Sequence, residues 1–386
     1  MKIQSATIFI IKIPFRRTFR HSTKVRKTSE SIIVRLMTKN GIVGYGEGAP
    51  RFYVTGEKIQ TAVKYIEKVL WPKISSMEYS DIKLGGDPIK ALAQIKNSLP
   101  NRKTKGVIAW HSAIGAMELA IIDCLLKQQK KSLSDLLRPK RQSVIYSGVI
   151  GLGSIKDSEI LAKKYKELGI KQIKIKIGNN DDRIRIEKIR NILGNTCSIR
   201  LDANGAYTIK KAIKALTILE QYNISCIEQP IKRSNYHDFK KVKDNISIPT
   251  MADESLVTIA DAKNLIKHEA CDYFNLRISK LGGISRTLEI AKMAELAGLK
   301  LQLGCLAGET AILSVASRFL AAYFNNAEFV EGSFGSFLLA EDISKKEIHF
   351  GRGGKAPLLK GYGLGIEIDD KILSKYSSKI IVLAKK

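Results

Sequence analysis

The chain has 386 residues, of which 44% are hydrophobic and 26% charged, a composition typical of a globular enzyme large enough for two domains without disulfide support. Five scattered cysteines without a C-x-x-C pair argue against a zinc knuckle and indicate a reducing compartment, and no run of about 18 apolar residues predicts a membrane span. The formal net charge of +28 raises nucleic acid as a partner, but the charge is spread along the chain without a dense basic block or interleaved aromatic residues, so we expect a solvated lysine-rich surface.

The N-terminal segment alternates apolar and polar residues in the manner of antiparallel strands. Its run at 7–14 is interrupted by Lys12 and lacks a small-residue cleavage site, so it predicts a strand and not a signal peptide, and we expect a cytoplasmic protein. Asn40 and Gly41 form a strong hairpin signal. The predicted strands are 3–13, 30–37 and 42–47, and the predicted helices are 56–70, 88–98 and 108–129. These elements predict an α+β domain over residues 1–135.

From Val144 short apolar runs alternate with helical segments, which is typical of βα units and a parallel sheet. The predicted strands are 144–149, 172–177, 198–202, 225–228, 249–252, 273–276, 299–303 and 328–331. Eight such strands favour a (β/α) barrel over an open sheet, and we assign it to residues 136–347. The glycine-rich segment 348–386 predicts turns that pack back on the first domain. A phosphate-binding loop is the alternative there, but no predicted helix follows its glycines.

Charged residues stand at the carboxyl ends of five predicted barrel strands. They are Lys176, Asp202, Glu228, Asp253 and Lys280, spaced 25 to 27 residues apart, which is about one βα unit. The carboxyl ends of barrel strands meet at one face of the barrel, and barrel active sites lie at that face. We therefore expect the five side chains to converge.

Three of these five residues are acids from successive strands, and together they form an all-oxygen site. Mg²⁺ fits such a site because it takes a few carboxylates and keeps positions free for water or substrate oxygens, and Mn²⁺ is the alternative ion. A single acid at a strand end is more often a helix cap or half of a surface ion pair. Three acids in phase, each in a different loop, favour the metal site.

Lys174 and Lys176 share one face of the predicted strand 172–177, because side chains alternate along a strand. In a barrel this face is the interior, where two ammonium groups repel each other and lose hydration, so we expect at least one depressed pKa. A lysine with a lowered pKa is a competent general base. The alternative is a solvent-facing strand in a lysine-rich chain.

Lys280 is predicted four strands away from Lys176, across the barrel mouth. Two bases on opposite sides of a metal-held carboxylate could remove an α-proton from one face and return it to the other. The three acids and three lysines therefore predict enolate chemistry.

With these residues the chain resembles the enolase superfamily, in its muconate-lactonising (mandelate racemase/muconate lactonising enzyme-like) subgroup, over nearly its full length. The motifs that carry the resemblance are "GYGEGAP" at 44–50, "AMELAIIDCLLKQQ" at 116–129, "KIK" at 174–176, "DAN" at 202–204, "EQP" at 228–230, "ADES" at 252–255, Lys280, "GGI" at 282–284 and "GYGLGIEID" at 361–369. The resemblance implies an α/β fold, a modified (β/α)7β TIM-type barrel, with an N-terminal α+β capping domain.

The resemblance also implies roles for individual residues. Lys176 and Lys280 resemble the bases on the two substrate faces, and Lys174 resembles a cation that neutralises the substrate carboxylate and lowers the pKa of Lys176. The implied Mg²⁺ ligands are Asp202, Glu228 and Asp253, their implied partners are Asn204 and Glu254, and Glu309 corresponds to an acid at the seventh strand end.

In this family two mobile loops of the capping domain close over the barrel, and the matching stretches are 19–27 and 50–56. The resemblance implies substrate contacts for Arg20, His21, Arg51 and Tyr53. The alternative for each of them is a solvated loop residue.

The resemblance leaves the reaction and substrate open. We favour a racemase or epimerase of N-acyl amino acids or dipeptides over a muconate-type cycloisomerase or an o-succinylbenzoate synthase-like dehydratase. Dipeptide epimerases of the Ala-Glu type carry an Asp-x-Asp after the eighth strand, whereas "FVEGSFGSFLL" at 329–339 offers Glu331 alone for an ammonium group. A basic nucleic-acid-binding or scaffold protein on an inactive barrel is the non-enzyme alternative. The family also implies a homo-oligomer.

Overall fold

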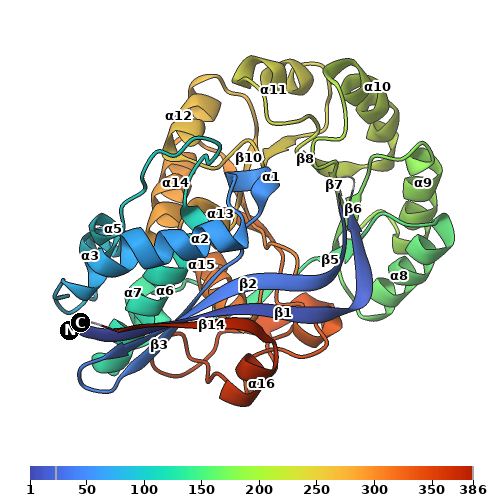
Figure 1. Cartoon of the computed structure of the whole chain (residues 1–386). Coiled ribbons are helices and arrows are strands. Elements are labelled where there is room, and N and C mark those ends of the chain that lie inside the picture. The colour runs from blue at the N-terminus through green and yellow to red at the C-terminus, as the bar shows by residue number, and fades with distance from the viewer. Residues whose placement is uncertain (22–23, 385–386) are drawn as a thin grey trace.

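The protein is described by a computed structural model that covers residues 1–21 and 24–384, with the backbone alone at 17, 19–21, 24, 25 and 336. It contains a four-stranded antiparallel sheet with its helices and an eight-stranded parallel sheet ringed by helices (Figure 1). One continuous hydrophobic core runs through both parts. Within the described ranges, no helix combines the length and the apolar character needed to cross a membrane.

The antiparallel sheet has the order β14-β1-β2-β3. Its strands are β1 (Ile3–His21), β2 (Lys24–Thr38), β3 (Val43–Gly48) and β14 (Ser377–Ala384). The first two strands are longer than the predicted 3–13 and 30–37, because they continue past an irregularity between Pro14 and Phe19 as one hairpin. Figure 1 shows this hairpin reaching from the sheet to the barrel mouth. β14 pairs with β1, so the C-terminal segment completes the sheet.

The helices of this part are mostly short, and α6 is their centre, with sixteen buried residues from His111 to Leu126. The helical elements are α1 (Phe52–Thr55), α2 (Ile59–Tyr65), the π-helical turn η1 (Ile66–Leu70), α3 (Trp71–Ser75), α4 (Pro88–Ala91), α5 (Ala93–Ser98), α6 (His111–Gln128) and α7 (Leu133–Leu137). The predicted helix 56–70 is wrong at its start, because Gly56 has a left-handed φ of 81° and ends α1. The predicted helix 88–98 is interrupted at Leu92.

The glycines of "GYGEG" explain how β3 packs on α6. A Cβ atom at Gly46 would overlap the carbonyl oxygen of Ala116, and one at Gly48 would overlap that of Ser112. The missing side chains let the strand lie directly on the helix backbone.

The parallel sheet follows chain order from β5 to β12. Its strands are β5 (Gly148–Ile150), β6 (Gln172–Lys176), β7 (Ser198–Asp202), β8 (Ile224–Glu228), β9 (Thr250–Ala252), β10 (Tyr273–Leu276), β11 (Lys300–Leu303) and β12 (Ala327–Val330). The Ser147 amide donates to the Val330 carbonyl at 2.9 Å and links the first strand region to the last. The structure is thus a (β/α) barrel beside an α+β part, as predicted.

The remaining helices surround the barrel or belong to its connections. They are α8 (Ile155–Glu167), α9 (Asp182–Leu193), α10 (Ile209–Leu219), η2 (Glu220–Tyr222), α11 (Tyr236–Lys243), α12 (Ile259–Lys267), α13 (Ile278–Leu281), α14 (Ile284–Leu296), α15 (Ala311–Tyr323), η3 (Gly335–Phe337), η4 (Arg352–Gly354) and α16 (Asp370–Lys375). The predicted strand 144–149 is wrong as one element: β4 (Ser143–Ile145) pairs with β13 (Lys355–Pro357), and β5 begins only at Gly148. The domain boundaries after residues 135 and 347 remain a prediction.

Candidate active site

The charged residues at the strand ends lie together at the carboxyl edge of the parallel sheet. The strand register sets Lys176 of β6 beside Asp202 of β7, and Asp202 beside Glu228 of β8. Asp253 follows β9 directly, and Lys280 lies in the short helix α13 after β10. All five residues are buried, with at most 7% of each exposed.

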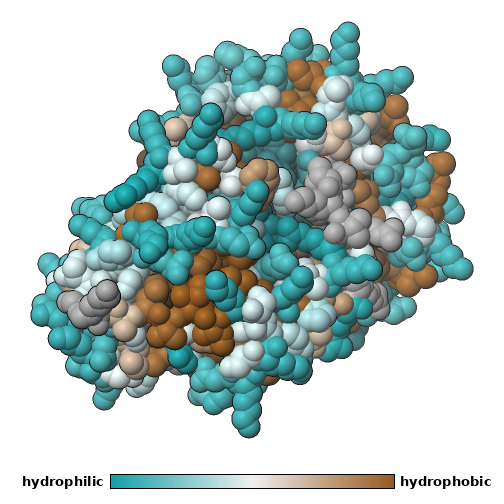
Figure 2. Space-filling model, in the orientation of Figure 1, coloured by the Kyte–Doolittle hydropathy of each residue, from teal (hydrophilic) through white to brown (hydrophobic). Residues whose placement is uncertain are grey.

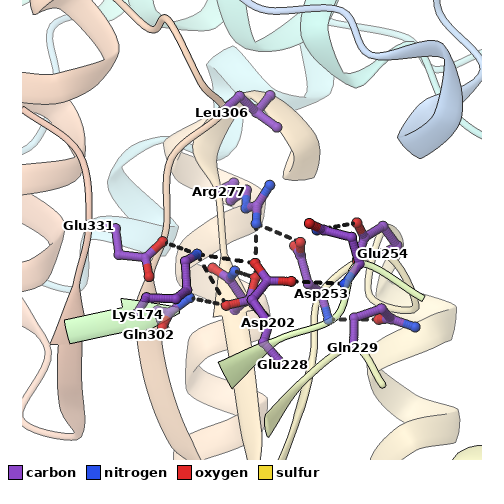
Figure 3. A network of polar contacts seen from close by, with 12 residues as sticks. Lys174, Asp202, Glu228, Gln229, Asp253, Glu254, Arg277, Gln302, Leu306 and Glu331 are labelled. Atoms are coloured by element: carbon purple, nitrogen blue, oxygen red, sulfur yellow. Dashed lines mark hydrogen bonds and ion pairs between the residues drawn. The ribbon is translucent and has the colours of Figure 1, made fainter. Parts of the chain in front are cut away.

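Lys174 lies among three carboxylates rather than against another cation (Figure 3). Its Nζ is 2.5 Å from Glu331 Oε2 and 3.4 Å from both Asp202 Oδ2 and Glu228 Oε2. Burial alone would lower the pKa of Lys174, but the carboxylates of Glu228, Glu331 and Asp202 outweigh it and raise that pKa. Lys174 is therefore held as a cation, and the depressed pKa expected of at least one of the two lysines is not found at this one.

Lys176 faces the cavity and is held by two oxygens. Its Nζ donates to Asp202 Oδ2 at 2.5 Å and to Asn204 Oδ1 at 2.7 Å. Asn204 has a left-handed φ of 44°, its amide donates to Asp202 Oδ1 at 3.0 Å, and its side chain donates to Glu254 Oε1 at 3.1 Å. Asn204 thus ties the first lysine to two of the acids.

Lys280 is completely buried, and its Nζ donates to three oxygens. They are the carbonyl of Asp253 at 2.8 Å, Asp253 Oδ1 at 2.9 Å and the carbonyl of Asn275 at 2.8 Å. Burial lowers the pKa of Lys280, and the opposing attraction of Asp253 does not offset it. The direction expected of a general base is found at this lysine.

Arg277, three residues before Lys280, is a site residue that the sequence analysis missed. Its Nη2 is 3.0 Å from Glu228 Oε1 and 2.6 Å from Asp253 Oδ2 (Figure 3). Arg277 lines the cavity whereas these two acids do not, so its guanidinium covers them on the cavity side. Burial would lower its pKa, but Asp253 and Glu228 raise it, so the residue is a permanent cation.

Burial and the neighbouring charges shift the pKa values of the acids in this site. Burial and the neighbouring Glu228 raise the pKa of Asp202, and burial followed by Asp253 raises that of Glu254 to about 8. Burial would also raise the pKa of Glu228, but Lys174 and Arg277 reverse the shift and hold it well below its usual range. Amide groups of Asn275 and Gln302 donate to Glu228 at 2.8 and 2.9 Å.

The donor set of Asp202, Glu228 and Asp253 fits Mg²⁺, which takes carboxylate oxygens. Glu254 Oε2 is buried and accepts no hydrogen bond within the described part of the chain, and the described partner of Asp253 Oδ2 is the Arg277 guanidinium, 2.6 Å away. As the described side chains stand, no three acids, histidines or cysteines form a ready-made ligand cluster, since Lys174 and Arg277 lie between the carboxylates. The side chains of Lys174 and Arg277 would have to move away from these carboxylates before Mg²⁺ could bind to them.

A cavity of about 710 Å³ opens above the site. Arg26 of the β1–β2 hairpin and Arg51 and Tyr53 of the following segment line it from one side, so the antiparallel part contributes to its wall. The barrel side supplies Lys174, Lys176, Asn204, Arg277 and Glu331. Lys280 is not part of the lining.

Four residues of the antiparallel part were predicted to contact the substrate, and the structure describes the side chains of two of them. Arg51 is buried, and its guanidinium donates to the carbonyls of Glu30 at 3.1 Å and Ala307 at 3.0 Å, while burial lowers its pKa to about 10. Tyr53 is 38% exposed at the cavity wall. The side chains of Arg20 and His21 lie outside the described residues.

The two predicted acids near the last strands have different environments. Glu309 accepts from the Leu306 amide at 2.6 Å, burial raises its pKa to about 8, and it is not part of the large cavity's lining. Glu331 lines that cavity but is only 2% exposed, and it accepts from Lys174 and from Arg200 Nη2 at 2.9 Å. Arg200 also escaped the sequence analysis, although it shares the strand phase of Asp202.

Comparison with known proteins places this geometry in context. Residues 5–138 match the mandelate racemase/muconate lactonizing enzyme N-terminal domain, and residues 157–372 match the enolase C-terminal domain-like family. A hydrophobic dipeptide epimerase of Enterococcus faecalis is 32% identical over 84% of this chain and 88% of its own. The crystal structure of N-succinyl Arg/Lys racemase from Bacillus cereus superimposes with a TM-score of 0.87 at 26% identity, covering 99% of this chain and all of that one. A dipeptide epimerase of E. faecalis complexed with Mg and L-Leu-L-Tyr gives 0.82 at 29% identity, over 95% of this chain and all of that one.

Proposed function

The chain belongs to the mandelate racemase/muconate lactonizing enzyme family of the enolase superfamily, and from this premise we propose that it racemises or epimerises N-acyl amino acids. It is an isomerase that abstracts the proton α to a carboxylate, and Mg²⁺ is its cofactor. The scaffold or nucleic-acid-binding alternative gives way to this assignment. Our proposal concerns the substrate and the residues that act on it.

The ion pairs of Glu331 are the observation that favours an N-acyl substrate over a dipeptide with a free amino group. Both its oxygens are engaged, Oε2 by Lys174 at 2.5 Å and Oε1 by Arg200 at 2.9 Å. A substrate ammonium would have to displace one of two buried cations from it, and either cation would lose a buried ion pair. Glu331 is therefore a counter-ion of the site, and an acylated nitrogen avoids the conflict.

The remaining charges of the cavity support an anionic substrate. Its described lining carries five basic side chains, which are those of Arg26, Arg51, Lys174, Lys176 and Arg277. The described acids of the lining are Glu331 and Asp157, and Asp157 accepts from the Ser154 hydroxyl at 2.7 Å at the start of α8. The electrostatic field thus favours a carboxylate and disfavours a second positive group.

An apolar wall of the same cavity provides room for the acyl group or the side chain. It combines β5–α8 residues with the segment after β12, namely Leu152, Ile160, Leu161, Phe334, Phe337 and Leu338. Phe337 and Ile160 are more than half exposed, at 53% and 57%. Covering such side chains with an apolar substrate group stabilises the complex by about 25 cal/mol per Å².

The proposed reaction uses three lysines. Lys176 removes the α-proton on the face that it reaches from the cavity, and Lys280, whose pKa burial lowers, exchanges a proton on the opposite face. Lys174 remains a cation and neutralises the substrate carboxylate. Asp202, Glu228 and Asp253 are the residues that would hold Mg²⁺, and the ion would supply positive charge for the developing enolate. Because Lys280 lies behind Arg277 and Asp253, the side chain of Arg277 moves aside in the productive complex.

Solvent exchange tests the proposal. The protein is incubated in D₂O with Mg²⁺ and with matched N-acetyl and N-succinyl amino acids, dipeptides and cis,cis-muconate, and α-deuterium and lactone are followed by NMR. We expect exchange of the N-acyl compounds, with kcat/KM at least tenfold higher than for dipeptides of the same side chain. Faster exchange of dipeptides would overturn the assignment, and lactone from muconate would establish the cycloisomerase alternative, which the cation-rich lining also accommodates.

We also propose that the protein is cytoplasmic and that nucleic acid is not its partner.

We further propose that the protein is a homo-oligomer. β14 is an edge strand, and its Ile380 and Val382 are 49% and 69% exposed. Figure 2 shows an apolar patch where β14 crosses the front of the molecule, on an otherwise mostly hydrophilic face. An exposed edge of this kind is suited to pairing with a second copy. Sedimentation would show a dimer or larger species, and Ile380→Lys with Val382→Lys would weaken it.

A further inference from the structure

Both proposed base lysines have their main-chain carbonyl held by a buried side chain that does not touch the cavity. His111 Nδ1 lies 2.8 Å from the carbonyl oxygen of Lys280. Arg185 Nη2 donates to the carbonyl oxygen of Lys176. His111 is 3% and Arg185 0% exposed, and neither lines the cavity. The two contacts reach the lysines from different parts of the fold, α6 for Lys280 and α9 for Lys176.

The contact at Lys280 is part of a region where the turn after this lysine packs closely against α6. Gly282 and Gly283 have φ values of +86° and +109°, a Cβ at Gly282 would come within 2.8 Å of the His111 ring, and one at Gly283 would overlap Glu118 Oε2. The Ala49 amide also donates to the Ser279 hydroxyl at 2.8 Å. The lysine turn is thus fixed by the antiparallel part of the chain, and not by the barrel alone.

The His111 contact has a defined proton arrangement. A carbonyl oxygen can only accept, so Nδ1 carries the hydrogen, and Nε2 is left to accept from the Asn101 side chain 3.4 Å away. Burial lowers the pKa of His111 to about 3, which keeps the ring neutral and this tautomer in place.

The contact at Lys176 rests on an ion pair. Arg185 Nη2 is 2.8 Å from Asp182 Oδ1, and Arg185 Nη1 donates to the Gly151 carbonyl at 3.2 Å. Asp182 Oδ2 in turn accepts from the Gly178 and Asn179 amides at 2.5 and 2.8 Å. The pair therefore closes the loop that leaves β6 immediately after the lysine.

We propose that His111 and Arg185 are positioning residues, each of which sets the reach of one lysine and therefore serves one face of the substrate. The inference rests on the proposed racemase function, because only a two-base reaction separates the faces. Proton transfer requires the base within hydrogen-bond distance of the α-carbon proton, and displacement of a base by about 1 Å costs up to about 100-fold in rate. A merely structural role for either residue would slow both faces alike.

The test measures α-proton exchange in D₂O separately for the two enantiomers of one N-acyl substrate. Lys176→Met and Lys280→Met first establish which enantiomer each lysine serves. His111→Leu is expected to lower kcat at least tenfold for the Lys280 enantiomer and less than threefold for the other, with KM little changed. His111→Asn, which keeps a donor near the Nδ1 position, is expected to recover most of that loss. Arg185→Gln is expected to show the opposite enantiomer preference.

Two control variants lie on the same helices. Met117→Ala shortens a buried apolar side chain of α6, and Arg190→Gln removes a buried α9 arginine that donates to the carbonyls of Tyr222, Gly194, Cys197 and Asn223. Both controls are expected to leave the ratio of the two enantiomer rates unchanged. Equal slowing of both enantiomers in His111→Leu or in Arg185→Gln would overturn the positioning role.

A substrate-free readout separates this inference from the proposed function. In protein labelled with ¹⁵N at lysine, the Lys→Met variants assign the Nζ resonances, and His111→Leu is expected to shift that of Lys280 alone while Arg185→Gln shifts that of Lys176 alone. If the wild-type protein exchanges no N-acyl substrate, the proposed function fails while these shifts still decide the contacts. Shifts of both resonances, or of neither, would overturn the inference whatever the substrate.

Discussion

Arg200 Nη2 lies 2.9 Å from Glu331 Oε1, and the two side chains are 1% and 2% exposed. This contact fixes one oxygen of the acid that would otherwise be free for a substrate ammonium group. Arg200→Met removes it and leaves Glu331 with Lys174 alone. Because the buried Glu331 carboxylate loses one of its two cations and is not rehydrated there, we expect the free energy of unfolding to fall by about 3 kcal/mol, the lower end of the range for a broken buried ion pair, measured by urea denaturation.

A double-mutant cycle with Glu331→Gln gives the coupling between these two residues. Arg200→Met in the Glu331→Gln background is expected to cost less than in the wild type, because residue 331 then carries no charge for Arg200 to balance. Lys292→Met serves as the control, since it breaks an exposed pair with Glu295 at 3.1 Å and should cost less than about 1 kcal/mol. An equally small effect of Arg200→Met would contradict the counter-ion role of Glu331.

Arg277 covers Glu228 and Asp253 on the cavity side, so it competes with any ion that uses those oxygens. Arg277→Met is expected to lower the melting temperature of the metal-free protein, because two buried acids lose a cation, and to increase the stabilisation that Mg²⁺ confers. Calorimetric titration should show Mg²⁺ binding at least about tenfold more tightly, which corresponds to about 1.4 kcal/mol.

The matched control for that experiment is Arg233→Met. Arg233 Nη2 also contacts a carboxylate, Asp261 at 2.9 Å, but Arg233 does not line the cavity. This variant should leave the Mg²⁺ affinity unchanged. An Arg277→Met protein with wild-type affinity would mean that the guanidinium and the ion do not share oxygens.

The strand pattern predicted the barrel and the meeting of its charged residues because both follow from local periodicity. Strands 172–177 and 198–202 agree closely with β6 and β7, and side-chain alternation places Lys174 and Lys176 together on the inner face. One βα unit per charged residue then brings the strand ends to the same edge. The ends of β1 and β2 were missed, because charged residues such as Arg16 and Lys27 hide the strand pattern of the hairpin.

Ion-pair partners could not be predicted in the same way. The sequence shows Lys174 beside Lys176 and predicts repulsion. In the fold, Glu228 and Glu331, which are 54 and 157 positions away, lie 3.4 and 2.5 Å from Lys174 and together raise its pKa. Arg277 escaped attention because one arginine in a chain with 65 lysines and arginines carries no local signal. Such pairs depend on which strands the barrel brings face to face.

Gly283 has a φ of +109°, and a Cβ there would overlap Glu118 Oε2 of α6. Gly283→Ala is therefore expected to lower the free energy of unfolding by at least about 2 kcal/mol, through backbone strain and overpacking together. Gly86→Ala is the control, since a Cβ at Gly86 meets no atom within 4 Å. Urea denaturation measures the stability of both variants. Equal stabilities of Gly283→Ala and Gly86→Ala would show that the turn at Gly283 does not pack tightly against α6.

His111 makes the free energy of unfolding depend on pH. Because the ring is buried, its contribution decreases as the pH falls. Its pKa is about 3 in the folded protein because burial disfavours the imidazolium, whereas an ordinary histidine titrates near 6.5. Between these two pH values the unfolded chain binds the proton and the folded chain does not. The stabilisation is complete above about pH 6.5 and is lost as the pH falls toward 3, by up to about 1.4 kcal/mol per pH unit.

Urea denaturation of wild type and His111→Gln from pH 7.5 to 4 isolates this contribution. Buried acids such as Glu47 and Glu57, whose pKa values burial raises to about 7, produce the opposite slope, but they are present in both proteins and cancel in the difference. The variant is expected to be less stable than wild type at pH 7.5 and to approach it as the pH falls. His237→Gln, at an exposed histidine, should keep the wild-type slope. A constant gap between wild type and His111→Gln would mean that His111 accepts a proton in the folded protein as readily as in the unfolded chain.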